Sequence, residues 1–118
     1  MSPVTIDIQT NPNIHFRIDS FAIPDSARAE FEEAMHRNMA FIEKLPGFLG
    51  HVAFEKVGGP TTFNVVTIAV WKSREAFDEA AEAVRSYYQR IGFDGPATLT
   101  RWGVKAEIGN YHAPHRMQ

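Results

Sequence analysis

The chain has 118 residues, of which 44% are hydrophobic and 22% are charged, a balance typical of one soluble globular domain. The absence of cysteine excludes a disulfide framework, a thiol nucleophile and a thiolate metal site, and a net charge of −2 without a basic cluster argues against a nucleic-acid partner. The longest apolar run is far shorter than a membrane span of ~20 residues, and the first residues lack the pattern of a secretory signal, so we expect a cytoplasmic protein.

Residues 1–13 are predicted to form an N-terminal arm, with a weak alternation that favours a short extra strand lying on a partner chain. The alternation in residues 14–21 is cleaner and predicts a half-buried strand. Its apolar side carries Ile14, Phe16 and Ile18, and its polar side carries His15, Arg17 and Asp19.

A first helix is predicted from about residue 24, where a proline and an acidic residue mark a helix start, to the stop at Leu45-Pro46-Gly47. Its apolar residues recur at helical spacing: Ala27, Phe31, Ala34, Met35, Ile42 and Leu45. Residues 48–56 form the next predicted strand. A turn at residues 57–61 joins that strand to the following one in a hairpin.

The strand at Val65–Trp71 is apolar on both sides, which predicts a central strand that is covered on each face. Ser73 follows as the expected N-cap of a second helix, which runs to Ile91 and carries its apolar residues on one side. A last strand is predicted at residues 99–108, and a loose tail at residues 109–118.

The order strand, helix, strand, strand, helix, strand predicts an α+β fold of the ferredoxin-like type. Two helices would cover one face of a four-stranded antiparallel sheet, and strands one and three would be its central pair. The domain would span residues 14–108. Because the helices cover only one face, the second apolar side of the central strand needs another cover, and we expect a homodimer in which a second copy provides it.

Three polar or amphipathic side chains fall on predicted inner faces and are candidates for catalysis: Asn38, Trp71 and Tyr88. The Asn38 amide either ties its helix to a neighbouring backbone group or faces a ligand cavity. The Trp71 indole either fills the core or donates its N–H to a ligand, and the Tyr88 phenol is open to the same two interpretations. Aromatic residues expected to form the walls of a substrate cavity are Phe16, Phe48, Phe77, Tyr87 and Trp102.

The five histidines do not assemble into a site. His36 lies on the polar side of its helix, and His15 on the polar side of the first strand. His51 is expected to face the second copy, although a bulge at Gly50 would reverse its direction. The His112 and His115 pair in the tail is weak evidence for a metal, so no metal is predicted.

Segments 45–50 (LPGFLG) and 70–77 (VWKSREAF), with the strand order, resemble the antibiotic biosynthesis monooxygenase domain family of dimeric α/β-barrel proteins over residues 14–108. The resemblance implies an oxygenase of aromatic, polyketide-like substrates that works without flavin, haem or metal. It also implies a pocket between helices and sheet that contains Asn38 and Trp71. Such an oxygenase must deprotonate its substrate to give an electron-rich anion that reacts with dioxygen. The base stays open between a tyrosine phenolate, a loop histidine and ordered water.

The same family has a haem-degrading branch whose pocket pattern Trp71 and Phe48 also match. The predicted second helix, however, has no histidine to ligate iron, and Phe16 stands where that branch places an asparagine. A small-molecule binder without catalytic activity is the remaining alternative.

Overall fold

The structure, a computed structural model, describes residues 5–7 and 11–118. Its elements follow in the order β1 (His15–Ala22), η1 (Asp25–Ala27), α1 (Arg28–Ile42), β2 (Phe48–Glu55), β3 (Val65–Trp71), α2 (Arg74–Ile91), α3 (Gly95–Trp102), β4 (Lys105–Tyr111) and η2 (His115–Met117). The strands form one antiparallel sheet in the order β2-β3-β1-β4. The ferredoxin-like prediction is confirmed, with β1 and β3 as the central pair.

The junction between β3 and α2 forms as the sequence predicts. The Ser73 side chain accepts a hydrogen bond from the Ala76 backbone N–H at 3.0 Å, and Gly92 ends the helix in the left-handed region at φ 69°. Neither α2 nor any other helix in residues 5–7 and 11–118 combines the length and apolar character that crossing a membrane requires.

The prediction of a strand from residue 99 is wrong at its start, because residues 95–102 form the additional helix α3. The Asp94 carboxylate caps this helix by accepting from the Ala97 N–H at 3.0 Å, and Pro96 occupies the first turn, where its missing N–H breaks no helical bond. Gly103 then ends α3 in the left-handed region. As a result β4 starts at Lys105 and runs to Tyr111, beyond the expected end at residue 108.

The strand expected in the N-terminal arm falls mostly outside the described residues. Residues 5–7 and 11–13, which the structure does describe, are not part of a strand.

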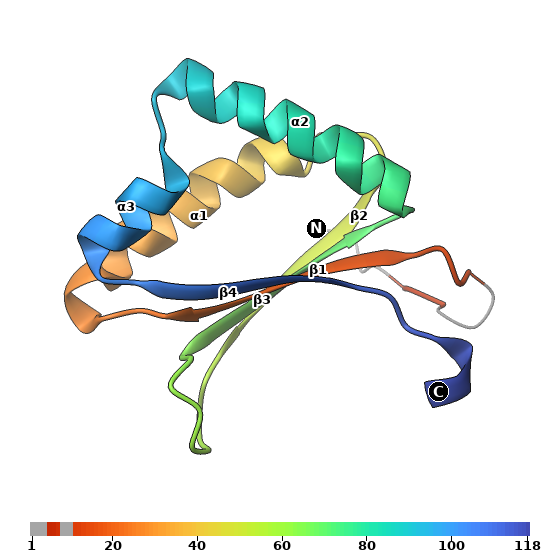
Figure 1. Cartoon of the computed structure of the whole chain (residues 1–118), viewed down its shortest axis with the longest axis horizontal. Helices are drawn as coiled ribbons and strands as arrows, with labels where there is room; N and C mark the ends of the chain where they lie inside the picture. Colours follow the sequence, from red (N-terminus) through yellow and green to blue (C-terminus); the bar gives the residue numbers. More distant parts are fainter. Residues whose placement is uncertain (1–4, 8–10) are drawn as a thin grey trace.

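All three α-helices lie on one side of the sheet (Figure 1). Ring contacts identify the strand residues on this side, since Phe21 of β1 packs against Phe31 of α1 and His15 packs against Phe77 of α2. Residues paired across an antiparallel ladder share a face. The helix-facing side therefore carries His15, Arg17, Asp19 and Phe21 from β1, and Val65, Thr67, Ala69 and Trp71 from β3.

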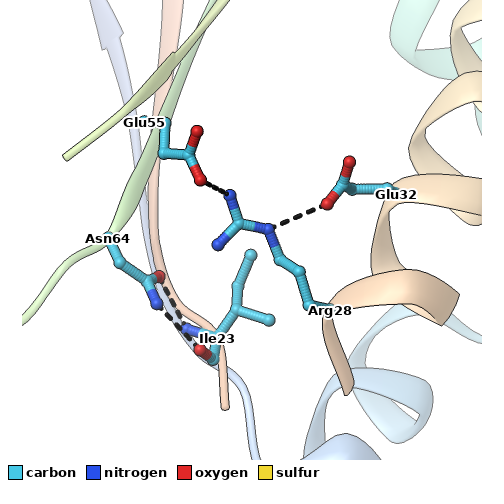
Figure 2. A network of polar contacts seen from close by, with 5 residues as sticks. All are labelled: Ile23, Arg28, Glu32, Glu55 and Asn64. Atoms are coloured by element: carbon cyan, nitrogen blue, oxygen red, sulfur yellow. Dashed lines mark hydrogen bonds and ion pairs between the residues drawn. The ribbon is translucent and has the colours of Figure 1, made fainter. Parts of the chain in front are cut away.

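One end of the space between helices and sheet is filled, and we call it the closed end. Its buried apolar residues are Ile23, Ala27, Phe31, Val65 and Val104. The Asn64 side chain closes this end by accepting from the Ile23 N–H at 2.9 Å and donating to the Ile23 carbonyl at 2.8 Å (Figure 2). Nearby, Arg28 of α1 forms ion pairs with Glu32 at 2.9 Å and with Glu55 of β2 at 2.7 Å.

The side of the sheet that faces away from the α-helices, called the outer face below, is apolar. It carries Phe16, Ile18, Val66, Ile68 and Val70 from the central strands, and Val52 and Phe54 from β2. Phe54 is 51% exposed and Val52 is 42% exposed. These two side chains lie on the face that the sequence assigns to a second copy.

Candidate functional site

A groove of about 880 Å³ opens between α1 and the edge strand β2. Met35 and Met39 line it from the helix, and Phe48, His51 and Ala53 line it from the strand. This volume lies within the range of about 300 to 1,000 Å³ that small-molecule sites occupy, and most of the lining is apolar. The groove is therefore large enough for a flat organic molecule.

A β-bulge in β2 turns His51 toward the helices. The pairing between β2 and β3 shifts between Phe48 and Gly50, so His51 lies opposite Ala69, a residue of the helix-facing side. The expectation that His51 faces the second copy is wrong, and the structure has the irregularity near Gly50 that the sequence left open. The bulge thus brings an imidazole into the groove.

The sheet beneath the helices carries a group of polar side chains that we call the polar floor, made of Arg17, Asp19, His51 and Thr67. His51 and Arg17 flank Ala69 in one row across the sheet, and Asp19 follows in the next row beside Thr67. The Arg17 Nε donates to the Asp19 Oδ1 at 2.8 Å. The Arg17 side chain is 28% exposed and the Asp19 side chain is 22% exposed. An ion pair therefore lies half-buried on the side of the sheet that most proteins fill with apolar residues.

Burial and mutual charge shift the pKa of both titratable groups on this floor. Burial raises the pKa of Asp19, against the lowering effects of the Arg17 guanidinium and of His51. Burial lowers the pKa of His51, and the Asp19 carboxylate opposes that shift. His51 is consequently a neutral imidazole at pH 7, and a neutral imidazole can accept a proton.

Trp71 is the last residue of β3 and lies on the side of the sheet that faces the helices, with 3% of its surface exposed. Its ring makes edge-to-face contacts with Phe48 at 5.3 Å and with Phe77 at 6.2 Å between ring centroids. The indole Nε1 is buried and has no hydrogen-bond partner among the residues that the structure describes. Because a buried donor left unpaired is unfavourable by about 1 to 3 kcal/mol, an acceptor from outside the chain would stabilise this site.

Tyr88 lies on the same face of α2 as Phe77, three helical turns further on. Burial raises the pKa of Tyr88, while the Arg37 guanidinium opposes the shift. The phenol therefore stays protonated at neutral pH and can donate a hydrogen bond. This direction argues against the tyrosine phenolate as the base.

The remaining predicted site residues lie on the two long helices, on the outer face of the sheet and at the closed end. Tyr87 stacks on Phe41 at 4.1 Å and joins the two long helices, and the half-buried Asn38 accepts from the Arg37 Nε at 3.3 Å. Phe16 lies on the outer face. Trp102 belongs to α3, packs against the closed end and donates its indole N–H to Glu30 at 2.9 Å. The structure thus brings Phe48, Trp71 and Phe77 together and places Phe16 and Trp102 away from them.

Sequence reasoning missed Arg17, Asp19 and His51. A signal was present, because the first strand was predicted to be central and a central strand with both faces covered must bury its polar side as well. Charged residues on the buried side of a central strand indicate a functional site.

Metal binding has little support in the described part of the chain. No group of three or more histidine, cysteine, aspartate or glutamate side chains there could hold a metal ion. His112 and His115 in the tail do not gain the third ligand that a site would need.

Comparison with known proteins shows what the chain is similar to. The family model for antibiotic biosynthesis monooxygenase matches residues 15–85. SnoaB, a cofactor-independent oxygenase from Streptomyces nogalater, is similar with 28% identity and a TM-score of 0.63, over 87% of this chain and 95% of that chain. A heme-degrading protein from Mycobacterium tuberculosis is similar with 28% identity and a TM-score of 0.51, over 58% of this chain and 77% of that chain.

A conserved protein from Methanosarcina mazei has the same fold, with a TM-score of 0.61 at 12% identity over 90% of this chain and 99% of that chain. A search of curated protein sequences gives no significant match.

Proposed function

Because the chain belongs to the antibiotic biosynthesis monooxygenase family, we propose that it is a cofactor-independent oxygenase of an aromatic, polyketide-like small molecule. The substrate would lie between the helices and the sheet, entering by the groove beside β2. The observation that carries this proposal is the buried indole N–H of Trp71, which lacks a partner among the described residues and needs an acceptor. A substrate oxygen or a reduced oxygen species would supply that acceptor.

The proposed chemistry starts with loss of a proton from the substrate, which leaves an electron-rich anion. The anion gives an electron pair to dioxygen and forms a C–O bond, which leaves a peroxide on the substrate carbon. The second C–H bond of that carbon then breaks, its electron pair forms the C=O bond, and the O–O bond breaks. One oxygen atom therefore stays in the oxidised product and the other leaves as water. Fixed donors near the developing negative charge lower the barrier in a site from which water is excluded. The Trp71 indole N–H and the Tyr88 phenol would be such donors, and Asn38 would help to hold the substrate.

The central experiment measures oxygen consumption with anthrone as the substrate. Trp71→Phe keeps the ring but removes the donor, and we expect turnover to fall by about tenfold to a hundredfold. Trp102→Phe is the matched control, because it removes an indole N–H that bonds to Glu30 away from the groove. Unchanged turnover in Trp71→Phe combined with Asn38→Ala would remove both assigned roles.

The homodimer is part of the same proposal. The outer face exposes Val52 and Phe54 on a wide apolar surface, and a second copy that presents the same face would bury both. Sedimentation at micromolar concentration should give a dimer, and Phe54→Asp should shift the population toward the monomer. A monomeric wild-type profile would contradict the arrangement.

The alternative functions are a binding module without catalysis and a haem-binding relative. A cavity below about 300 Å³ would have favoured a module with a filled interior, whereas the groove measures about 880 Å³. The similarity to a heme-degrading protein is the observation that supports the second alternative. Haemin titration tests it directly, because a saturable Soret shift at one equivalent per chain would favour haem binding over the proposed oxygenase.

A further inference from the structure

The polar floor offers an answer to a question that the proposed function leaves open, namely which group removes the substrate's proton. Building on that proposed function, we infer that His51 is the proton acceptor and that Arg17 holds the oxygen anion formed. For the aromatic substrate of the proposed function, this assignment requires an acidic C–H group and a carbonyl oxygen at opposite ends of one conjugated ring.

The step is balanced within the site. A C–H bond of the substrate breaks, and its proton moves to an imidazole nitrogen of His51. The electron pair is delocalised across the ring onto the carbonyl oxygen, which becomes an enolate anion beside the Arg17 guanidinium. Nothing is oxidised in this step, and dioxygen enters only afterwards.

The sheet register fits a substrate of this shape. His51 on β2 and Arg17 on β1 lie on either side of Ala69, so their Cα atoms are separated by two inter-strand spacings, roughly 10 Å. Between them the sheet presents only the methyl group of Ala69, with Ala53 and Thr67 in the next row. This spacing suits a flat ring that enters from the groove at His51, with its acidic carbon toward His51 and its oxygen toward Arg17.

Arg17 is fixed in a way that leaves it able to bind an anion. Its Nε is engaged by Asp19 at 2.8 Å, and its guanidinium lies 5.6 Å from the centre of the Phe77 ring. No described residue accepts a hydrogen bond from its terminal amino groups. A preoriented guanidinium with free amino groups suits an oxygen anion.

Other titratable groups near the floor are weaker candidates for the base. His36 of α1 and Glu43 at its C-cap line the same groove, but both side chains are exposed and neither belongs to the floor. The Asp19 carboxylate is intrinsically a weaker base than imidazole, and one of its oxygens already accepts from Arg17. Tyr88 on α2 stays protonated, and Arg37 on α1 carries a permanent positive charge. The His51 ring makes no hydrogen bond to any described residue, so its lone pair is free.

The charges on the floor support the transfer. Before the step, Arg17 and Asp19 balance each other and His51 is neutral. After the step, the new imidazolium lies near the Asp19 carboxylate and the new enolate lies near Arg17. Each new charge thus gains an opposite charge that was already in place.

The test measures proton removal without oxidation. Anthrone is mixed with the protein in anaerobic D₂O, and exchange of its methylene protons is followed by NMR. We expect His51→Gln to slow the catalysed exchange by about a hundredfold or more, and Arg17→Gln to slow it by about tenfold. His112→Gln is the matched histidine control, because His112 is exposed in the tail and should leave the rate unchanged.

The pH dependence of the exchange rate is a second test, which applies even if His51→Gln fails to fold. The exchange rate of the wild type should fall below pH 6.5 as His51 becomes protonated, and Asp19→Asn should move this fall to lower pH, because Asp19 favours the protonated imidazole. Exchange that is equally fast in folded His51→Gln, or an acid limb that Asp19→Asn leaves in place, would overturn the assignment. Catalysed exchange without oxygen consumption would contradict the proposed oxygenase but not the role of His51.

Discussion

The closed end and the polar floor, two regions of the space between helices and sheet, differ in the kind of side chain that they bury. At the closed end, apolar side chains pack around Phe31, and the Asn64 amide satisfies both backbone groups of Ile23 (Figure 2). At the polar floor, an ion pair and a histidine lie half-buried, and the neighbouring Trp71 keeps an unpaired indole N–H. The difference indicates that stability is concentrated at one end and chemistry at the other.

The largest expected effect tests the closed end. Phe31 is 7% exposed and packs edge-to-face on Phe21 at 4.9 Å. Phe31→Ala should lower the free energy of unfolding by about 3 to 5 kcal/mol, through lost burial and the cavity left behind. Urea unfolding followed by circular dichroism measures this loss.

Trp71→Phe should change the free energy of unfolding by less than about 1.5 kcal/mol, since it keeps a buried ring and removes an unpaired donor. Equal losses at the two ends would break the comparison.

Asn64→Ala should have the next largest effect. It leaves the Ile23 N–H and carbonyl without their partner, and each unsatisfied buried group is unfavourable by about 1 to 3 kcal/mol. We expect a total loss of about 2 kcal/mol in the free energy of unfolding. Asn13→Ala is the control, because Asn13 is exposed. A loss as small as that of the control would show that water replaces the amide.

The sequence predicts most of the fold because the fold depends on short-range patterns. The two apolar sides of Val65–Trp71 predicted its central place, and Ser73 predicted the start of α2. The helix α3 was missed since its signal is short: Asp94 as cap, Pro96 in the first turn and Gly103 at the end. An eight-residue helix gives too few turns for an apolar period to be recognised.

The candidate site was predicted less well because it depends on which way each strand faces. Trp71, Phe48 and Phe77 follow from apolar periodicity and do come together. Arg17 and His51 do not follow from alternation, since it separates two sides of a strand without telling which side faces the helices. The predicted central place of the first strand, which requires its polar side to be covered, was the only signal for Arg17. For β2 the bulge near Gly50 adds a one-residue shift, which the sequence left open as an alternative and which the alternation of side chains could not decide.

A smaller effect is expected from the ion pairs that join α1 to the edge of the sheet. Arg28 bridges Glu32 and Glu55, whose side chains are 50% and 73% exposed (Figure 2). Arg28→Gln should lower the free energy of unfolding by less than about 1 kcal/mol, and the loss should shrink further at 1 M salt because exposed charges are screened. A loss comparable to that of Asn64→Ala would place the closed end's stability in its charges instead of its packing.

The smallest expected effect comes from His51 and concerns the pH dependence of stability. Its folded-state pKa is lowered by burial from the ordinary value of 6.5, so its contribution to stability is fully present above pH 6.5. As the pH falls below 6.5, the unfolded chain binds a proton that the folded chain refuses, and the free energy of unfolding decreases. Asp19 acts in the opposite direction nearer pH 3.8, because its pKa is raised and protonation then favours the folded state. Urea unfolding between pH 7 and pH 5 should therefore show a decline that is weaker in His51→Gln and unchanged in His112→Gln. A decline in His51→Gln identical to that of the wild type would mean that burial on the polar floor does not hold the His51 imidazole in its neutral form.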